Sequence, residues 1–103
     1  MKAYLITPAS QSVEFVEISG IDDIIDLIGY NTIEADPIDE NGTRLYFDEE
    51  CFIRGDAVSG RFQLDSLIPI AGLAVVAGAD NDAEDICDVK VHIDELRGRI
   101  KFL

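Results

Sequence analysis

The chain has 103 residues, of which 48% are hydrophobic and 28% are charged, and its formal net charge is −13 at pH 7. This length and hydrophobic content predict one globular domain, residues 1–103, with a single modest core. The charge comes from 21 acidic and 8 basic residues. Since lysine and arginine supply most of the affinity for phosphates, the composition argues against direct binding to nucleic acid, and anionic membrane surfaces are disfavoured for the same reason.

The N-terminus and the cysteines bear on location. The first residues alternate like a strand and lack the apolar core and cleavage site of a signal peptide, so we expect a cytoplasmic protein. The longest uncharged run, residues 67–78, is shorter than the roughly 20 residues that span a bilayer. Cys51 and Cys87 form no CxxC pair, so we expect two reduced, buried thiols, with a disulfide between them as the less favoured alternative.

The first part of the chain changes from strand-like to helix-like patterns. Residues 2–7 and 13–18 show the period-two alternation of half-buried strands. A helix is predicted over residues 21–28, with Ser19 as its N-cap and Gly29 just beyond its C-terminus. Its apolar stripe has the spacing i, i+3, i+4 and i+7 and consists of Ile21, Ile24, Ile25 and Ile28.

Residues 41–42, Asn-Gly, predict a two-residue hairpin turn between strand-like segments at 30–35 and 45–47. Pro37 lacks a backbone N–H, so its arm of the hairpin is expected at a sheet edge or at a bulge. The expected register joins unlike charges and apolar partners. It pairs Glu40 with Thr43, Asp39 with Arg44, and Ile38 with Leu45.

The second half is organised around residues 73–77, which are apolar at every position. Such a segment predicts an interior strand, and Gly78 is expected to end it. Residues 89–93 alternate like another half-buried strand. The remaining expectations are a short strand at 51–53, a turn at 54–56, a loop at 57–63, a helical turn within 64–70, an acidic loop at 79–88, a turn of helix at 94–97 and a last strand at 100–103.

Together these patterns predict an α+β fold. We expect a mostly antiparallel sheet of about five to six strands, with the helix at 21–28 packed on one face. No linker, internal repeat or second domain is visible in the sequence.

Motifs that identify enzymes are missing from the sequence. It has no phosphate-binding glycine loop, zinc-binding cysteine pattern or nucleophile motif, so we expect a non-enzymatic protein without a cofactor. His92, the only histidine, is expected to face solvent or a polar partner. Residues 80–85 are acidic, but the sixth position from Asp80 is not glycine and the twelfth is Val91 rather than glutamate, unlike an EF-hand loop. A looser divalent-metal site within residues 80–88 stays open as an alternative function.

Charge is the feature that departs most from an ordinary domain. Residues 90–103 carry a net charge of +2, whereas residues 1–89 carry −15. In one interpretation, the basic end packs beside acidic strands of its own fold. In the other, the acidic body binds the basic surface of a partner, for instance by imitating DNA, whose phosphates recur about every 1.7 Å along the helix axis. The carboxylates first expected at such a contact surface are Asp22, Asp23, Asp26, Glu34, Asp36, Asp39, Glu40, Asp48, Glu49 and Glu50.

The order of several segments is a further clue. The chain opens with Lys2-Ala3-Tyr4-Leu5-Ile6 and continues with Val13-Glu14-Phe15-Val16-Glu17-Ile18, a short helix ending near Gly29-Tyr30, an Ile33-Glu34 strand, and Gly72-Leu73-Ala74-Val75-Val76-Ala77-Gly78 before an acidic loop. This arrangement resembles a family of small uncharacterised bacterial domains that phages and plasmids often carry. The resemblance implies a bacterial cytoplasm and interference with DNA-handling systems, and it implies no catalytic residues.

The leading expectation is therefore an acidic interaction module, in its sharpest form a DNA-mimicking inhibitor of a nuclease or another DNA-binding protein. A small homo-oligomeric structural module is the alternative. An exposed apolar edge at residues 46–47 or 102–103 would favour that alternative.

Overall fold

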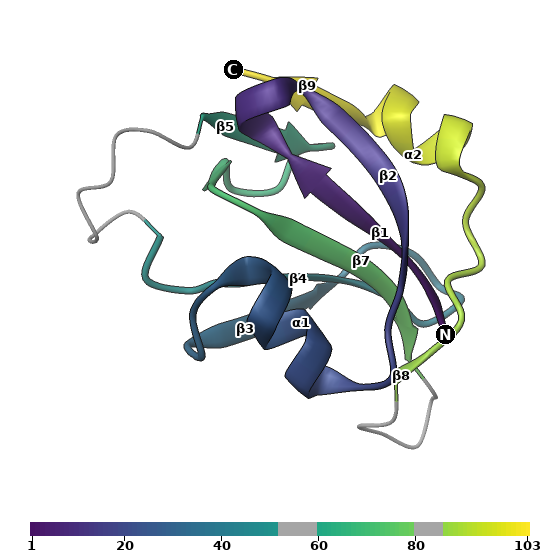
Figure 1. Cartoon of the computed structure of the whole chain (residues 1–103). Helices are drawn as coiled ribbons and strands as arrows, with labels where there is room; N and C mark the ends of the chain where they lie inside the picture. Colours follow the sequence, from purple (N-terminus) through teal and green to yellow (C-terminus); the bar gives the residue numbers. More distant parts are fainter. Residues whose placement is uncertain (52–59, 80–85) are drawn as a thin grey trace.

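A computed structural model describes residues 1–51, 60–79 and 86–103, which form two antiparallel sheets and two α-helices (Figure 1). The large sheet consists of β1 (Lys2–Thr7), β2 (Ser12–Glu17), β3 (Ile33–Pro37), β4 (Thr43–Asp48), β7 (Ala74–Ala79) and β8 (Ile86–Cys87). The small sheet consists of β5 (Arg61–Leu64), β6 (Ile70–Ala71) and β9 (Ile100–Phe102). The helices are η1 (Pro8–Ser10, a 3₁₀ turn), α1 (Ile21–Ile28) and α2 (Ile93–Arg99). The predicted α+β class is confirmed.

The large sheet has the strand order β2-β1-β7-β4-β3, with β8 paired to β7. Strand β7 lies at its centre and all six of its residues are buried, which confirms the predicted interior strand. The prediction that Gly78 ends this strand was wrong, because β7 continues to Ala79. A Cβ atom at Gly78 would lie 2.3 Å from the Asp88 carbonyl oxygen, so glycine allows the close approach of the following chain.

Helix α1 covers one face of the large sheet and has the predicted bounds. Its buried residues Ile24 and Ile28 pack in a cluster with Val75 and Ala77 of β7. Gly29 ends the helix as expected, with a φ of 90° and an N–H that donates to the Ile25 carbonyl at 2.8 Å. The prediction of Ser19 as the N-cap was wrong. The N-cap is Gly20, which has no side chain that could cap the helix.

The small sheet and α2 cover the opposite face, so the prediction of one helix on one face was incomplete (Figure 1). Phe62 and Leu64 of β5 and Leu96 of α2 are fully buried there. The predicted loop at 57–63 was wrong for residues 61–63, which belong to β5, and the predicted helical turn within 64–70 is absent from these described residues. Residues 52–59 lie outside the described part, and Cys51 lies in a turn after β4.

The predicted strand at 89–93 was also wrong. Residues 88–92 have no regular secondary structure, and α2 begins at Ile93. His92 is the exposed N-cap, and its Nδ1 accepts the Asp94 N–H at 3.2 Å. The Val91 carbonyl accepts the Tyr4 hydroxyl at 2.6 Å, and the Val89 N–H donates to the Lys2 carbonyl at 2.9 Å, so single hydrogen bonds to β1, rather than a ladder, hold this segment. The predicted strand at the C-terminus is confirmed as β9.

The β3–β4 hairpin exists, but its predicted register was wrong by two residues. Pro37 lies opposite Arg44, and Asp36 lies opposite Leu45. The Asp39 carboxylate accepts the N–H groups of Asn41 at 2.8 Å and Thr43 at 3.1 Å, which builds a longer turn than the two-residue one. The placement of Pro37 on an edge strand is confirmed.

Candidate functional site

The ten carboxylates predicted for a contact surface do not form one surface. Three lie on α1, two lie on β3, and five lie in or beside the turns that flank β4. On β3, Ile33 and Ala35 pack in the cluster beneath α1. Because successive strand residues point to opposite faces, Glu34 and Asp36 face away from α1. The predicted set is therefore divided between the two faces of the large sheet.

Near β4, two of the ten carboxylates hold turns of the fold. Asp48 is only 4% exposed, and its carboxylate accepts the Thr32 hydroxyl and the Glu50 N–H. Asp39 holds the hairpin turn. Partial burial by itself would raise the pKa of Asp39, but hydrogen bonds from Thr43 and Asn41 outweigh burial and lower it. Neither group is presented as a free surface charge.

An open groove of about 390 Å³ lies between β2 and α1. Its lining combines apolar and acidic side chains, namely Val16, Glu17, Asp23, Asp26 and Leu27. Asp26 also lines a second shallow opening, of about 460 Å³, at the C-terminal end of α1. Together with the exposed Asp22, these groups give the α1 side a concentration of carboxylates. We call Glu17, Asp22, Asp23 and Asp26 the α1–β2 acidic surface.

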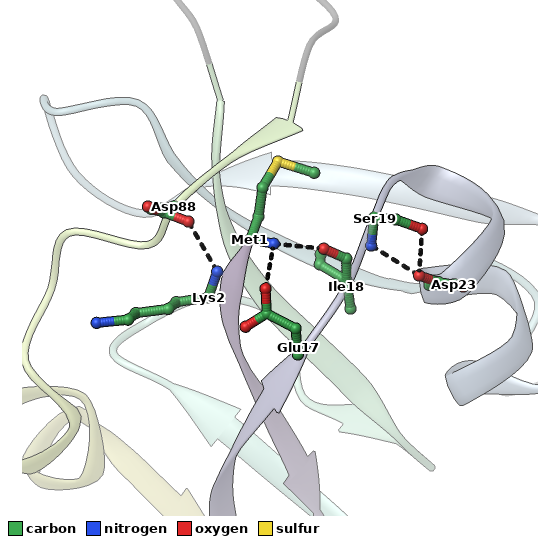
Figure 2. Close-up of polar contacts among 7 residues, drawn as sticks. All are labelled: Met1, Lys2, Glu17, Ile18, Ser19, Asp23 and Asp88. Carbon is green, nitrogen blue, oxygen red and sulfur yellow. Dashed lines mark hydrogen bonds and ion pairs between the residues drawn. The ribbon is translucent and has the colours of Figure 1, made fainter.

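Hydrogen bonds fix two of these carboxylates in place (Figure 2). The Met1 amino group donates to Glu17 at 2.8 Å and to the Ile18 carbonyl at 2.5 Å. The Ser19 N–H and hydroxyl each donate to the Asp23 carboxylate at 2.7 Å. The backbone hydrogen bond from Ser19, followed by its hydroxyl bond, lowers the pKa of Asp23. Asp23 therefore stays charged over a wide pH range while it secures the entry to α1.

Sequence reasoning missed Glu17 as a site residue. Glu17 is an ordinary outward residue in the strand pattern, and nothing local marks it. It joins the site because the end of β2 lies beside α1 in the fold. The three predicted α1 carboxylates had a local signal, since aspartates flanked an apolar helical stripe.

The chemistry of this groove is that of carboxylates beside apolar surface. Its five lining residues include no thiol, imidazole or hydroxyl group. Carboxylates accept hydrogen bonds from ammonium and guanidinium groups, so the groove suits lysine or arginine side chains. Within residues 1–51, 60–79 and 86–103, no three His, Cys, Asp or Glu side chains are placed to hold a metal ion. The loop considered for a divalent ion falls largely at 80–85, outside the described residues.

The basic C-terminal end belongs to α2 and the small sheet, which cover the face of the large sheet opposite α1. The Arg97 guanidinium donates to the Val13 carbonyl at 2.9 Å. Arg99 donates to the Ile38 carbonyl at 2.7 Å and makes a two-pronged ion pair with Asp65. Strand β9 pairs with β5 rather than with an acidic strand. The interpretation that the basic end packs along acidic strands is therefore replaced by arginines that bind backbone carbonyls and the carboxylates of Asp65 and Asp94.

The two cysteines are free, as expected, but both are half-buried rather than buried. Among the described residues, no helix is long and apolar enough to cross a membrane. Comparisons with family models, curated proteins and solved structures found no match for this chain. The functional assignment therefore rests on the geometry of the chain itself.

Proposed function

We propose that this protein is a non-enzymatic interaction module that binds a basic protein surface. The observation that supports the proposal is the groove between β2 and α1, which Glu17, Asp23 and Asp26 line in a chain of net charge −13. A field of this size accelerates encounter with a cationic partner. The apolar residues Val16 and Leu27 beside the carboxylates offer contact area for the stems of lysine or arginine side chains.

A DNA-mimicking inhibitor of a DNA-binding protein is the sharpest form of this proposal. Mimicry needs an exposed array of negative charge. The division of the ten predicted carboxylates between two faces counts against an array made of all ten. The smaller α1–β2 acidic surface is the part of the molecule that retains this role in the proposal.

A pull-down from bacterial lysate with paired variants tests the proposal. D22N/D26N removes two charges from the α1–β2 acidic surface, and E34Q/E40Q removes two exposed charges from the β3 arm as a control. We expect the wild type and the control to capture the same DNA-binding protein, which added salt and duplex DNA release, and we expect D22N/D26N to lose it. Equal capture by both variants would show that net charge, not this surface, is responsible.

A homo-oligomeric module is the second candidate because apolar side chains are exposed. Leu103 is 57% exposed and Ile68 is 77% exposed, whereas Tyr46 is buried, so residues 46–47 do not form an exposed edge. Repulsion between two chains of −13 opposes self-association. Light scattering at low and high salt tests this candidate: a strict monomer under both conditions removes it.

A further inference from the structure

Resting on the proposed function, we infer that the free edge of β2 is the docking site and that an extended, basic segment of the partner adds to it as a further strand. Strand β2 ends the order β2-β1-β7-β4-β3 and pairs only with β1 in the described part of the chain. Strand addition at such an edge supplies affinity through main-chain hydrogen bonds and specificity through alternate side chains.

The hydrogen-bonding phase shows which groups of β2 are available. Met1 and Ile18 exchange backbone hydrogen bonds, which fixes them as a bonded pair. Bonded pairs recur at every second position of an antiparallel ladder, so Val16 and Glu14 bond to β1. The N–H and C=O groups of Phe15 and Glu17 therefore point away from the sheet.

Arg97 marks one limit of the free edge of β2. Its guanidinium already binds the Val13 carbonyl, which confirms the outward direction of the odd-numbered residues. An added strand therefore pairs with the part of β2 from Phe15 to Glu17. At the other end of the sheet, β3 finishes with Pro37, which has no N–H to offer and is a usual way of blocking an edge.

Phe15 gives the free edge an apolar contact that is held in place. Its side chain is 59% exposed, yet its ring centroid lies 4.9 Å from that of Tyr4 at an interplanar angle of 58°. The Tyr4 hydroxyl is itself bonded to the Val91 carbonyl. The ring is therefore supported from below and presents one side to an incoming residue.

Charge selects the occupant. Glu14, which is exposed, lies on the opposite face of β2 from Phe15, on the same face as Val16, which lines the groove together with Asp23 and Asp26. A bound segment with an apolar residue opposite Phe15, and with lysine or arginine on either side of that residue, would contact both the Phe15 ring and the carboxylates on the other face. A second copy of the chain would instead bring Glu14 and Glu17 against the same residues, and a charge of −13 against −13.

The first test uses a short, end-blocked peptide in which valine alternates with lysine or arginine. A peptide of the same composition, with all valines at one end, controls for charge. Amide hydrogen exchange, followed by NMR, reports the bonded groups. With the alternating peptide at saturation, we expect exchange at Phe15 and Glu17 to slow by about tenfold or more, whereas Glu14 and Val16, already bonded to β1, change little. The control peptide should not slow exchange at Phe15.

Variants provide the second test. F15A should weaken binding of the alternating peptide by about tenfold. F15P should weaken it further, because proline also removes the outward N–H without removing a bond to β1. A35P makes the same change at an outward position of β3 and should bind like the wild type. Melting temperatures of all three variants show whether each is folded.

The outcomes separate this inference from the proposed function. If both peptides bind equally and Phe15 and Glu17 exchange unchanged, docking at β2 is wrong while binding of basic surfaces stands. If the alternating peptide does not bind, docking at β2 is overturned, and the pull-down with D22N/D26N decides the proposed function separately. If Phe15 and Glu17 are protected without peptide in a dimeric protein, the occupant is a second copy and the inferred partner is wrong.

Discussion

The two faces of the large sheet are covered in different ways. One face is covered by α1, an eight-residue helix whose apolar stripe can be seen in the local sequence. The other is covered by β5, β6, β9 and α2, which come from distant parts of the chain and are tied down by Arg97, Arg99 and Tyr4. A local cover needs only the right periodicity, whereas a cover assembled from distant segments also needs specific polar anchors.

The difference extends to charge. The α1 cover exposes aspartates, and the opposite cover carries both the arginines of the C-terminal end and acids such as Asp65 and Asp94. A cationic partner therefore meets only carboxylates among the charged side chains of α1 itself, whereas the opposite cover presents charges of both signs. This contrast is what makes the α1–β2 acidic surface, rather than the whole molecule, the contact surface in our proposal.

The largest expected effect comes from deleting the central side chain of the assembled cover. Phe62→Ala should lower the free energy of unfolding by about 3–5 kcal/mol, because the ring is fully buried and its removal leaves a cavity. Ile24→Ala under α1 should cost about 2–5 kcal/mol by the same mechanism. Urea unfolding measures both, and Ile68→Ala, at a site 77% exposed, serves as the control. A smaller loss for Phe62→Ala than for Ile24→Ala would mean that the assembled cover contributes less than the helix.

Removing a polar anchor should have a smaller effect. Arg99→Ala breaks the bonds to Asp65 and to the Ile38 carbonyl and should cost about 1–3 kcal/mol. Arg99→Lys should recover only part of this loss, because an ammonium group cannot reproduce the fork of a guanidinium. Lys101→Ala, on the exposed side of β9, is the matched control. If Lys101→Ala costs as much, the effect is one of net charge.

The same ion pair predicts a pH dependence. The hydrogen bond from Arg99 outweighs burial and lowers the pKa of Asp65 below its ordinary value of 3.8. A lowered pKa in the folded state adds stability that is complete above the ordinary value and is lost as the pH falls through the lowered one. The difference in unfolding free energy between the wild type and Asp65→Asn should therefore be constant near neutral pH and shrink below 3.8. A difference that stays constant into strong acid would contradict the ion pair.

The smallest of these effects is expected at the start of α1. Asp23→Ala removes the carboxylate that accepts both Ser19 groups and should lower the melting temperature, by less than Arg99→Ala does. Asp22→Ala is the control, since it removes an equal charge from the same helical turn. Equal shifts for the two variants would assign the effect to the helix dipole rather than to the bonds to Ser19.

How far the sequence predicts this molecule follows from the same contrast between its faces. The helix at 21–28 was predicted to the residue, because one apolar stripe and a terminal glycine define it locally. The edge position of Pro37 followed from its missing N–H. The α1 part of the candidate surface was visible for the same local reason, whereas Glu17 was not.

The errors arise where side chains replace backbone pairing. The predicted register of the hairpin was wrong because the Asp39 carboxylate accepts two backbone N–H groups and lengthens the turn. The segment 89–93 has the alternation of a strand, but Tyr4 binds Val91 and His92 starts a helix. These side-chain hydrogen bonds leave no periodic signal in the sequence, so no pattern of polar and apolar residues predicts them.

The central position of β7 has a consequence for folding kinetics. In the large sheet, the β1–β2 and β3–β4 hairpins do not pair with each other, because β7 lies between them. Tyr4 of β1 and Leu45 of β4 both pair with Val76, from opposite sides of β7. During synthesis, both hairpins leave the ribosome before the strand that joins them. Topologies of this kind lose loop-closure entropy before the stabilising long-range contacts form, and they fold slowly for their size. The apolar faces of the two early hairpins therefore stay exposed until β7 pairs with them.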